Sequence, residues 1–251
     1  MRLIRFALFV ALLAQSANAQ VLEARQPRLL DQWIFGFSVY PAFPVGEFAK
    51  YQRLAGGVDF SVGFQPWRRQ PLTIRSTFGW LQYDSFNENE TGEVCDFFGN
   101  NCQTETFFYD SQNHSMSFAQ IGPEFFATDG TWRPYGYALY GATFFHSTAR
   151  FGSAQSSSSG SNGLHFSWNP SSTYGIGIRR VGAKDGRQYG FDFGARVLRN
   201  AEAEYATKDG VYRNADGTYD VHARHGAANL LIIHIGFNGG PFVNWSERPR
   251  R

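Results

Sequence analysis

Eight segments of the chain alternate apolar and polar residues with a period of two, which is typical of β-strands whose two faces meet different surroundings. In 58–65 every even position is apolar, and in 189–197 the apolar residues fall on odd positions. The alternation recurs in 35–43, 72–80, 115–126, 135–145, 174–179 and 231–237. It is irregular at 120–123, which indicates a β-bulge. The sequence therefore predicts an all-β fold.

The connections between these segments alternate in length along the chain. Short turns lie at 66–71, 129–131 and 184–186, and the last two contain the Asp-Gly turn signal. Long connections cover 44–57, 84–113, 152–173 and 200–229. Short turns at one end and long loops at the other are typical of outer-membrane barrels. We therefore predict an eight-stranded antiparallel up-and-down transmembrane β-barrel with both termini on the periplasmic side.

The chemistry of the two strand faces favours a membrane barrel. The polar face consists mainly of Gly, Ser, Thr and Gln, which suit the narrow lumen of an eight-stranded barrel. The apolar side chains expected to contact lipid include Phe60, Val62, Ile74, Phe78, Phe191, Phe193, Ile233 and Ile235. The alternative is a soluble periplasmic lipocalin-like barrel, with its apolar face turned inward around a small apolar ligand.

Six charged residues, three acids and three arginines, share the polar face of the predicted strands. They are Asp59, Arg75, Glu124, Arg179, Asp192 and Arg196, called here the lumen charge network. A buried charge is costly unless it is paired, so we expect these residues to form ion pairs that plug the lumen. Arginine suits this role because its planar guanidinium can bind two carboxylates at once. On a soluble sheet, the same residues would be exposed charges of little energetic consequence.

The N-terminal residues have the features of a secretory signal peptide. Arg2 and Arg5 precede an apolar run at 6–13, and Ala17-Asn18-Ala19 supplies the small residues of a cleavage site. We predict a cleaved signal peptide at 1–19, a periplasmic segment at 20–30, the outer-membrane β-barrel at 31–238 and a short basic tail at 239–251. The mature chain has no apolar stretch long enough for a spanning helix, so a membrane span would consist of strands.

Charge and aromatic content limit the surroundings of the protein. Loss of Arg2 and Arg5 with the signal peptide would reduce 23 basic residues to 21, equal to the 21 acidic ones, so no nucleic-acid partner is expected. Aromatic residues at strand ends predict girdles at the two membrane boundaries. The periplasmic girdle would contain Trp33, Trp67, Trp132, Tyr135, Tyr189 and Phe237. The outer girdle would contain Tyr40, Trp80, Tyr83 and Tyr174.

The only two cysteines lie seven positions apart in a polar stretch of the predicted outward loop at 84–113. In an exported protein this spacing favours a disulfide between Cys95 and Cys102. A metal site would need further ligands close by in the sequence, and the nearest histidine is His114.

One pair of residues suggests catalysis. His165 and Ser167 lie two positions apart, and lipid A deacylases are small barrels that use such a pair with an acid nearby. No acid lies at 166–180 to orient the histidine, so we expect no catalytic residues and keep a lipid A-modifying enzyme as the third interpretation. The segment 175–177 lacks the third glycine of a dinucleotide motif, and His222 and His225 are isolated in a loop. No cofactor or metal is therefore expected.

Short motifs within 31–238 add a family resemblance. The opening strand contains Phe35-Gly36-Phe37-Ser38-Val39, followed by Pro44-Val45-Gly46-Glu47-Phe48, and Arg133-Pro134-Tyr135 opens the fifth strand. In these features the chain resembles the small bacterial outer-membrane β-barrel family of Gram-negative cells, the eight-stranded type represented by the transmembrane domain of outer membrane protein A. The resemblance implies a monomer in outer-membrane lipid with a structural or adhesive role through its extracellular loops. Unlike that family, the chain continues past Phe237 to Arg251.

Overall fold

The computed structural model of the chain describes residues 33–66, 71–95, 102–128, 131–153, 160–184, 187–213 and 219–240. The predicted signal peptide at 1–19, the segment at 20–30, Trp67 and nearly all of the predicted tail lie outside these described residues.

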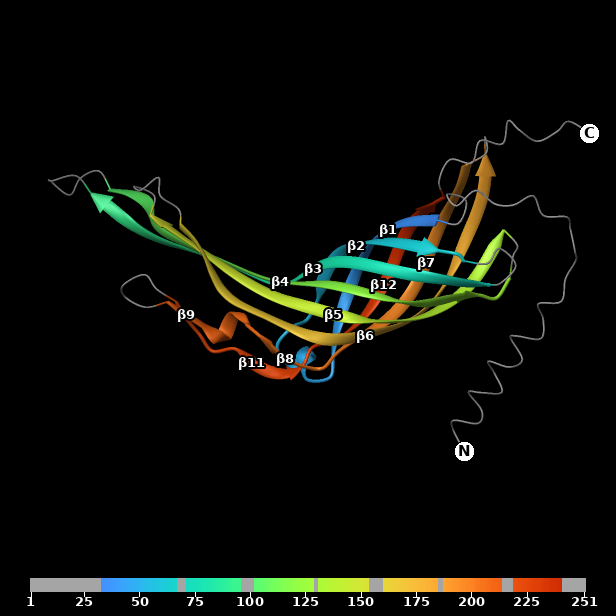
Figure 1. Cartoon of the computed structure of the whole chain (residues 1–251). Coiled ribbons are helices and arrows are strands. Elements are labelled where there is room, and N and C mark those ends of the chain that lie inside the picture. Colours follow the sequence, from blue (N-terminus) through green and yellow to red (C-terminus); the bar gives the residue numbers. More distant parts are fainter. Residues whose placement is uncertain are drawn as a thin grey trace, which may run out of the picture.

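Eight antiparallel strands form a closed barrel (Figure 1). They are β1 (Trp33–Val45), β2 (Ala55–Phe64), β3 (Leu72–Cys95), β4 (Cys102–Phe126), β5 (Trp132–Ser153), β6 (Gly160–Lys184), β7 (Arg187–Asn200) and β12 (Asn229–Gly239). Each strand pairs with its neighbour in this series, and pairing of β1 with β12 closes the sheet. The predicted eight-stranded up-and-down barrel is confirmed. Among the described residues, no helix is long and apolar enough to cross a bilayer.

The barrel presents its apolar face outward. Along β1 exposed and buried positions alternate, so that Phe37 is 49% exposed whereas the neighbouring Ser38 is 5% exposed. Seven of the eight side chains predicted to contact lipid are exposed, and Val62 is half-exposed. A soluble barrel with an apolar interior and a polar exterior would show the opposite arrangement, so the lipocalin-like alternative is wrong.

Four barrel strands extend well beyond the other four at one end of the molecule (Figure 1). The pairing of β3 with β4 continues from Asp84 opposite His114 to Cys95 opposite Cys102, and β5 and β6 remain paired up to Phe151 and Gly160. Most of the predicted loops at 84–113 and 152–173 are therefore paired strands, and their prediction as loops is wrong. Residues 84–113 and 153–163 are mostly polar or glycine, so their sequence shows no strong alternation although their backbones pair.

The bulge predicted at 120–123 is also wrong. β4 keeps one register with β3 through this segment, with Gln120 opposite Thr77 and Pro123 opposite Ile74. Exposure continues to alternate, since Gln120 is buried and Pro123 is exposed. The pattern looked irregular because Gly122 and Pro123 give no clear contrast of hydrophobicity. The register shifts between β3 and β4 lie elsewhere, at 82–84 and 90–91.

Shorter elements gather at the end that carries the strand extensions (Figure 1). A 3-10 turn, η2 (Phe48–Lys50), follows β1. The connection from β7 to β12 contains β8 (Glu202–Tyr205), η3 (Lys208–Gly210), β9 (Val211–Arg213), β10 (Tyr219–Val221) and β11 (Arg224–Ala227). In this connection β8 pairs with β11, and β9 pairs with β10. We call this end of the molecule the outer end.

Candidate functional site

All six residues of the lumen charge network lie inside the barrel, and each is at most 4% exposed. Arg75 Nη1 lies 2.8 Å from Glu124 Oε1, and Arg179 Nη2 lies 3.2 Å from the same oxygen. Arg179 also reaches the next carboxylate, with its Nε 3.0 Å from Asp192 Oδ2. Arg179 thus pairs with Glu124 and Asp192, and with Arg75 these residues form one chain of ion pairs.

The remaining two members form a separate pair, in which Arg196 Nη2 donates to Asp59 Oδ2 at 2.6 Å. Three permanent positive charges therefore face three carboxylates, so the interior of the barrel holds matched charge. This arrangement lowers the cost of keeping ions in a space without bulk water.

Asp192 binds three further side chains that sequence reasoning did not place in the lumen. The Tyr135 hydroxyl donates a short hydrogen bond to Asp192 Oδ1, and His234 Nε2 lies 3.1 Å from the same oxygen. Asn238 Nδ2 donates to the other carboxylate oxygen at 3.1 Å. A signal for His234 was present, because Ile233 and Ile235 were predicted to face outward and the residue between them must then face inward.

The predicted girdle positions of Tyr40, Tyr83 and Tyr135 are wrong, since each of these side chains is at most 5% exposed and lies inside the barrel. The Arg196 guanidinium lies 4.8 Å from the Tyr40 ring centroid, within cation–π range. Other predicted girdle residues do face outward and are exposed: Trp33, Trp80, Trp132, Tyr174, Tyr189 and Phe237.

Two glycines on β6 make room for inward tyrosines on β5. A Cβ atom on Gly175 would lie 2.3 Å from the Tyr137 ring, and one on Gly177 would lie 2.4 Å from the Tyr135 hydroxyl. Because Gly175 and Gly177 have no side chains, the lumen has room for the large rings of the neighbouring strand. The same ring of Tyr137 lies 4.7 Å from the Arg75 guanidinium.

The lumen next to the outer end is mostly apolar, although it also buries His114, whose Nδ1 lies 2.8 Å from Ser147 Oγ. Its side chains are almost completely buried and include Leu81, Met116, Phe145, Leu198, Leu230 and Ile232. Phe48 of η2 and Tyr205 of β8 join this cluster from the loops, with their ring centroids 5.0 Å apart in an edge-to-face contact. The Tyr83 hydroxyl donates to the Ala206 carbonyl at 3.0 Å, which ties β3 to the same loop.

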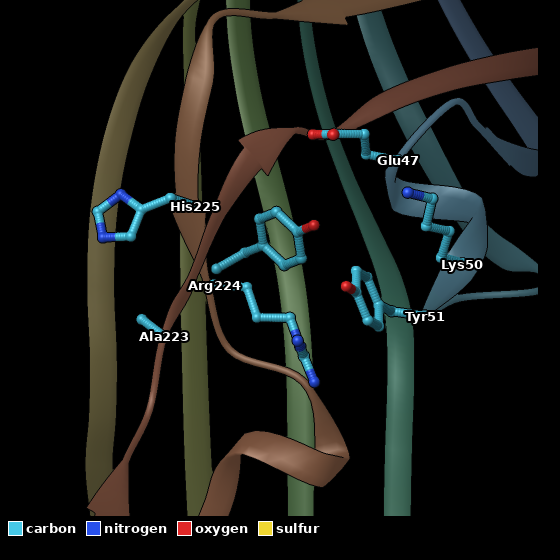
Figure 2. Close-up of a pocket in the computed structure, with 7 residues that line it drawn as sticks. Glu47, Lys50, Tyr51, Ala223, Arg224 and His225 are labelled. Carbon is cyan, nitrogen blue, oxygen red and sulfur yellow. The ribbon is translucent and has the colours of Figure 1, made fainter.

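A polar pocket of about 300 Å³ lies at the outer end, between η2 and the strands β8 and β11 (Figure 2). It is lined by Glu47, Lys50, Tyr51, Tyr205, Ala223, Arg224 and His225. Figure 2 shows Glu47, Lys50 and Tyr51 coming from the segment around η2, opposite the β11 residues. Sequence reasoning missed this pocket, because its two sides are far apart along the chain and no local pattern links them.

The residues weighed for catalysis lie at the outer end, on β6. His165 Nε2 lies 3.4 Å from the Glu204 carbonyl oxygen, and the Ser167 hydroxyl donates a short hydrogen bond to that oxygen. Both side chains thus bind the backbone of β8. His225 pairs with the Glu204 carboxylate at 3.1 Å, and the His222 ring packs edge-to-face on Tyr212. Among the described residues, no group of three His, Cys, Asp or Glu could hold a metal ion.

A closed eight-stranded barrel, with an apolar exterior and a polar, ion-paired layer inside, is the architecture of small outer-membrane β-barrel proteins. The chain has the fold of this class, and its apolar exterior suits contact with membrane lipid. No protein-family model and no curated protein matches it.

Three solved structures with a similar fold come from distant sequences. Neisserial surface protein A is 8% identical, with 82% of this chain and 94% of that chain covered and a TM-score of 0.42. The second structure is Ail, the attachment invasion locus protein of Yersinia pestis, in complex with the heparin analogue sucrose octasulfate. It is 12% identical, with 83% of this chain and 96% of that chain covered and a TM-score of 0.39. A major outer membrane protein from Thermus thermophilus is 11% identical over 81% and 98%, with a TM-score of 0.37.

Proposed function

We propose that the protein is a monomeric, non-enzymatic outer-membrane barrel that conducts no solutes and serves in recognition or adhesion through its outer end. The lumen charge network would plug one half of the interior, and the apolar cluster beneath Phe48 and Tyr205 would plug the other half. An eight-stranded barrel is only wide enough for its own side chains, so two such layers would leave no continuous water path.

The observation that carries this proposal is the double filling of the lumen. The charged layer contains ion pairs at 2.6 to 3.2 Å, and the apolar layer contains side chains such as Leu81 and Phe145 with no exposed surface. A pore would need a wetted path past both layers. With transport disfavoured, the outer end is the part of the protein available for a specific role, because binding functions concentrate on loops carried by a rigid scaffold.

Planar-bilayer recording of the full-length mature protein tests the closed lumen. We expect no steady single-channel current. A variant with Phe48→Ala, Tyr205→Ala, Arg75→Ala and Glu124→Ala removes the loop cover and one ion pair, and a current through it alone would show that these groups contribute to the barrier. A large, steady current through the unmodified protein would refute the proposal.

Two further features of the proposal concern export. The signal peptide would direct the chain across the inner membrane and be cleaved after Ala19, and Cys95 and Cys102 would then form a disulfide. The backbones of the two cysteines support this pairing, because they lie directly opposite each other where β3 ends and β4 begins. Their side chains lie outside the described part of the structure. N-terminal sequencing of the mature protein and a thiol assay test the two features separately.

A further inference from the structure

The polar pocket at the outer end has the chemistry of a binding site for a charged sugar. We propose that it binds an acidic sugar, meaning a sugar ring that carries a phosphate, sulfate or carboxylate group. This inference rests on the proposed recognition role of the outer end and names the ligand class. The volume of about 300 Å³ is at the lower limit of small-molecule sites and suits one sugar unit.

Two cationic side chains of the pocket can bind an anion. Two permanent cations, Lys50 and Arg224, line it together with one carboxylate, Glu47. The lining histidine, His225, is paired with the Glu204 carboxylate at 3.1 Å. Among the residues that the structure describes, neither Lys50 nor Arg224 takes part in an ion pair, so both charges are available to a ligand.

Arg224 is held in a fixed place before any ligand arrives. Its guanidinium lies 4.0 Å from the centroid of the Tyr51 ring, and its Nε donates to Thr207 Oγ1 at 3.4 Å. A guanidinium can present two parallel N–H donors to a phosphate, sulfate or carboxylate. Because Tyr51 and Thr207 already restrict the side chain, less conformational entropy is lost when an anion binds.

The remaining lining groups suit the hydroxyl groups of a sugar. The Glu47 carboxylate can accept hydrogen bonds, and it lies so close to β11 that a Cβ atom on Gly226 would be 2.9 Å from Glu47 Oε2. The Tyr205 hydroxyl lines the pocket and can donate a hydrogen bond. The Tyr51 ring is 41% exposed, which leaves aromatic surface for contact with a sugar ring.

Calorimetric titration of the full-length mature protein, folded in detergent micelles, tests the proposal. The probes are glucose 6-phosphate and glucuronate, with glucose as the neutral control. We expect each acidic sugar to saturate one site and glucose to bind at least about tenfold more weakly. Added NaCl should lower the affinity for the acidic sugars. Equal binding of glucose, or no binding of either acidic sugar by the folded protein, would overturn the inference.

Variants locate the binding in this pocket. Lys50→Gln combined with Arg224→Gln should lower the affinity for glucose 6-phosphate by at least about tenfold, because both cationic contacts are lost. Arg53→Gln removes an exposed cation that does not line the pocket and should leave binding unchanged. Gly226→Ala should also weaken binding, since the new methyl group displaces Glu47. Each variant is first shown to be folded by its heat-dependent migration in gels. Unchanged affinity in the folded double variant would refute the site.

Competition identifies the source of the acidic sugar, which could be the cell's own outer-leaflet glycolipid or a polysaccharide outside the cell. Vesicles containing phosphorylated lipopolysaccharide, compared with dephosphorylated lipopolysaccharide, test the first source, and soluble hyaluronate tests the second. Competition with glucose 6-phosphate by either polymer supports the proposal, and competition by neither overturns it. A conducting lumen would instead refute the closed barrel without affecting the sugar site.

Discussion

Replacement of Arg196 by alanine is the sharpest test of the charged layer in the lumen. The side chains of Arg196 and Asp59 are 1% and 0% exposed, and their ion pair measures 2.6 Å. Among the described residues, the Arg196 guanidinium is the only hydrogen-bond donor to Asp59, whose second oxygen has no partner. Arg196→Ala therefore leaves a carboxylate buried without compensation, and this should lower the free energy of unfolding by about 3 to 5 kcal/mol.

The measurement is reversible unfolding by urea of the protein folded into lipid vesicles, followed by tryptophan fluorescence. The matched control is Arg199→Ala, three positions along β7, where the side chain is exposed and the expected change is within about 0.5 kcal/mol. A double variant, Arg196→Met with Asp59→Leu, removes both charges and should be more stable than Arg196→Ala alone. If Arg196→Ala unfolds at the same urea concentration as Arg199→Ala, the buried pair does not stabilise the barrel.

Three other predictions address the exterior, the extension and the cover of the lumen. Phe193→Arg places a charge on the lipid face and should lower the free energy of unfolding by about 2 to 4 kcal/mol if the residue lies near the bilayer midplane. The same unfolding assay measures this change, and an unchanged free energy would contradict the lipid-facing position. Replacing Cys95 and Cys102 by Ser should leave the barrel folded but make the tip between them easier to cleave by external protease, whereas two reactive thiols in the exported protein would rule out the disulfide. Phe48→Ala removes a fully buried ring and should cost about 3 to 5 kcal/mol; a change below about 1 kcal/mol would show that η2 does not pack on the barrel.

The barrel itself could be predicted because one face of a membrane strand contacts lipid and the other faces a polar lumen. In 58–65 and 189–197 the lipid side is apolar and the lumen side is small or polar, so the period of two gives both the strand and its orientation. The same phase identified the inward positions of Asp59, Asp192 and Arg196. It also identified the outward positions of Phe191 and Phe193. These features need only local chemistry and a strand count.

On β5 the same reasoning led to a wrong result, because hydrophobicity did not distinguish the two faces. Its inward residues include Tyr135, Tyr137 and Leu139, while Gly136 and Ala138 face outward. The large rings fit inside because the adjacent strand contributes glycines, and this depends on a register that links residues about 40 positions apart. Local sequence therefore could not show that these tyrosines belong to the lumen.

The sequence by itself determined the strand number, the membrane-facing surface and the balance of charge inside the barrel. The tertiary structure alone decided which arginine meets which carboxylate, because Arg179 can join Glu124 and Asp192 only after β4, β6 and β7 close into one sheet. It also decided the polar pocket, whose opposite sides, Lys50 and Arg224, come from distant connections at the outer end. The period of the sequence indicates which face of a strand each residue occupies. Side-chain contacts across the lumen or between loops form only when the barrel closes.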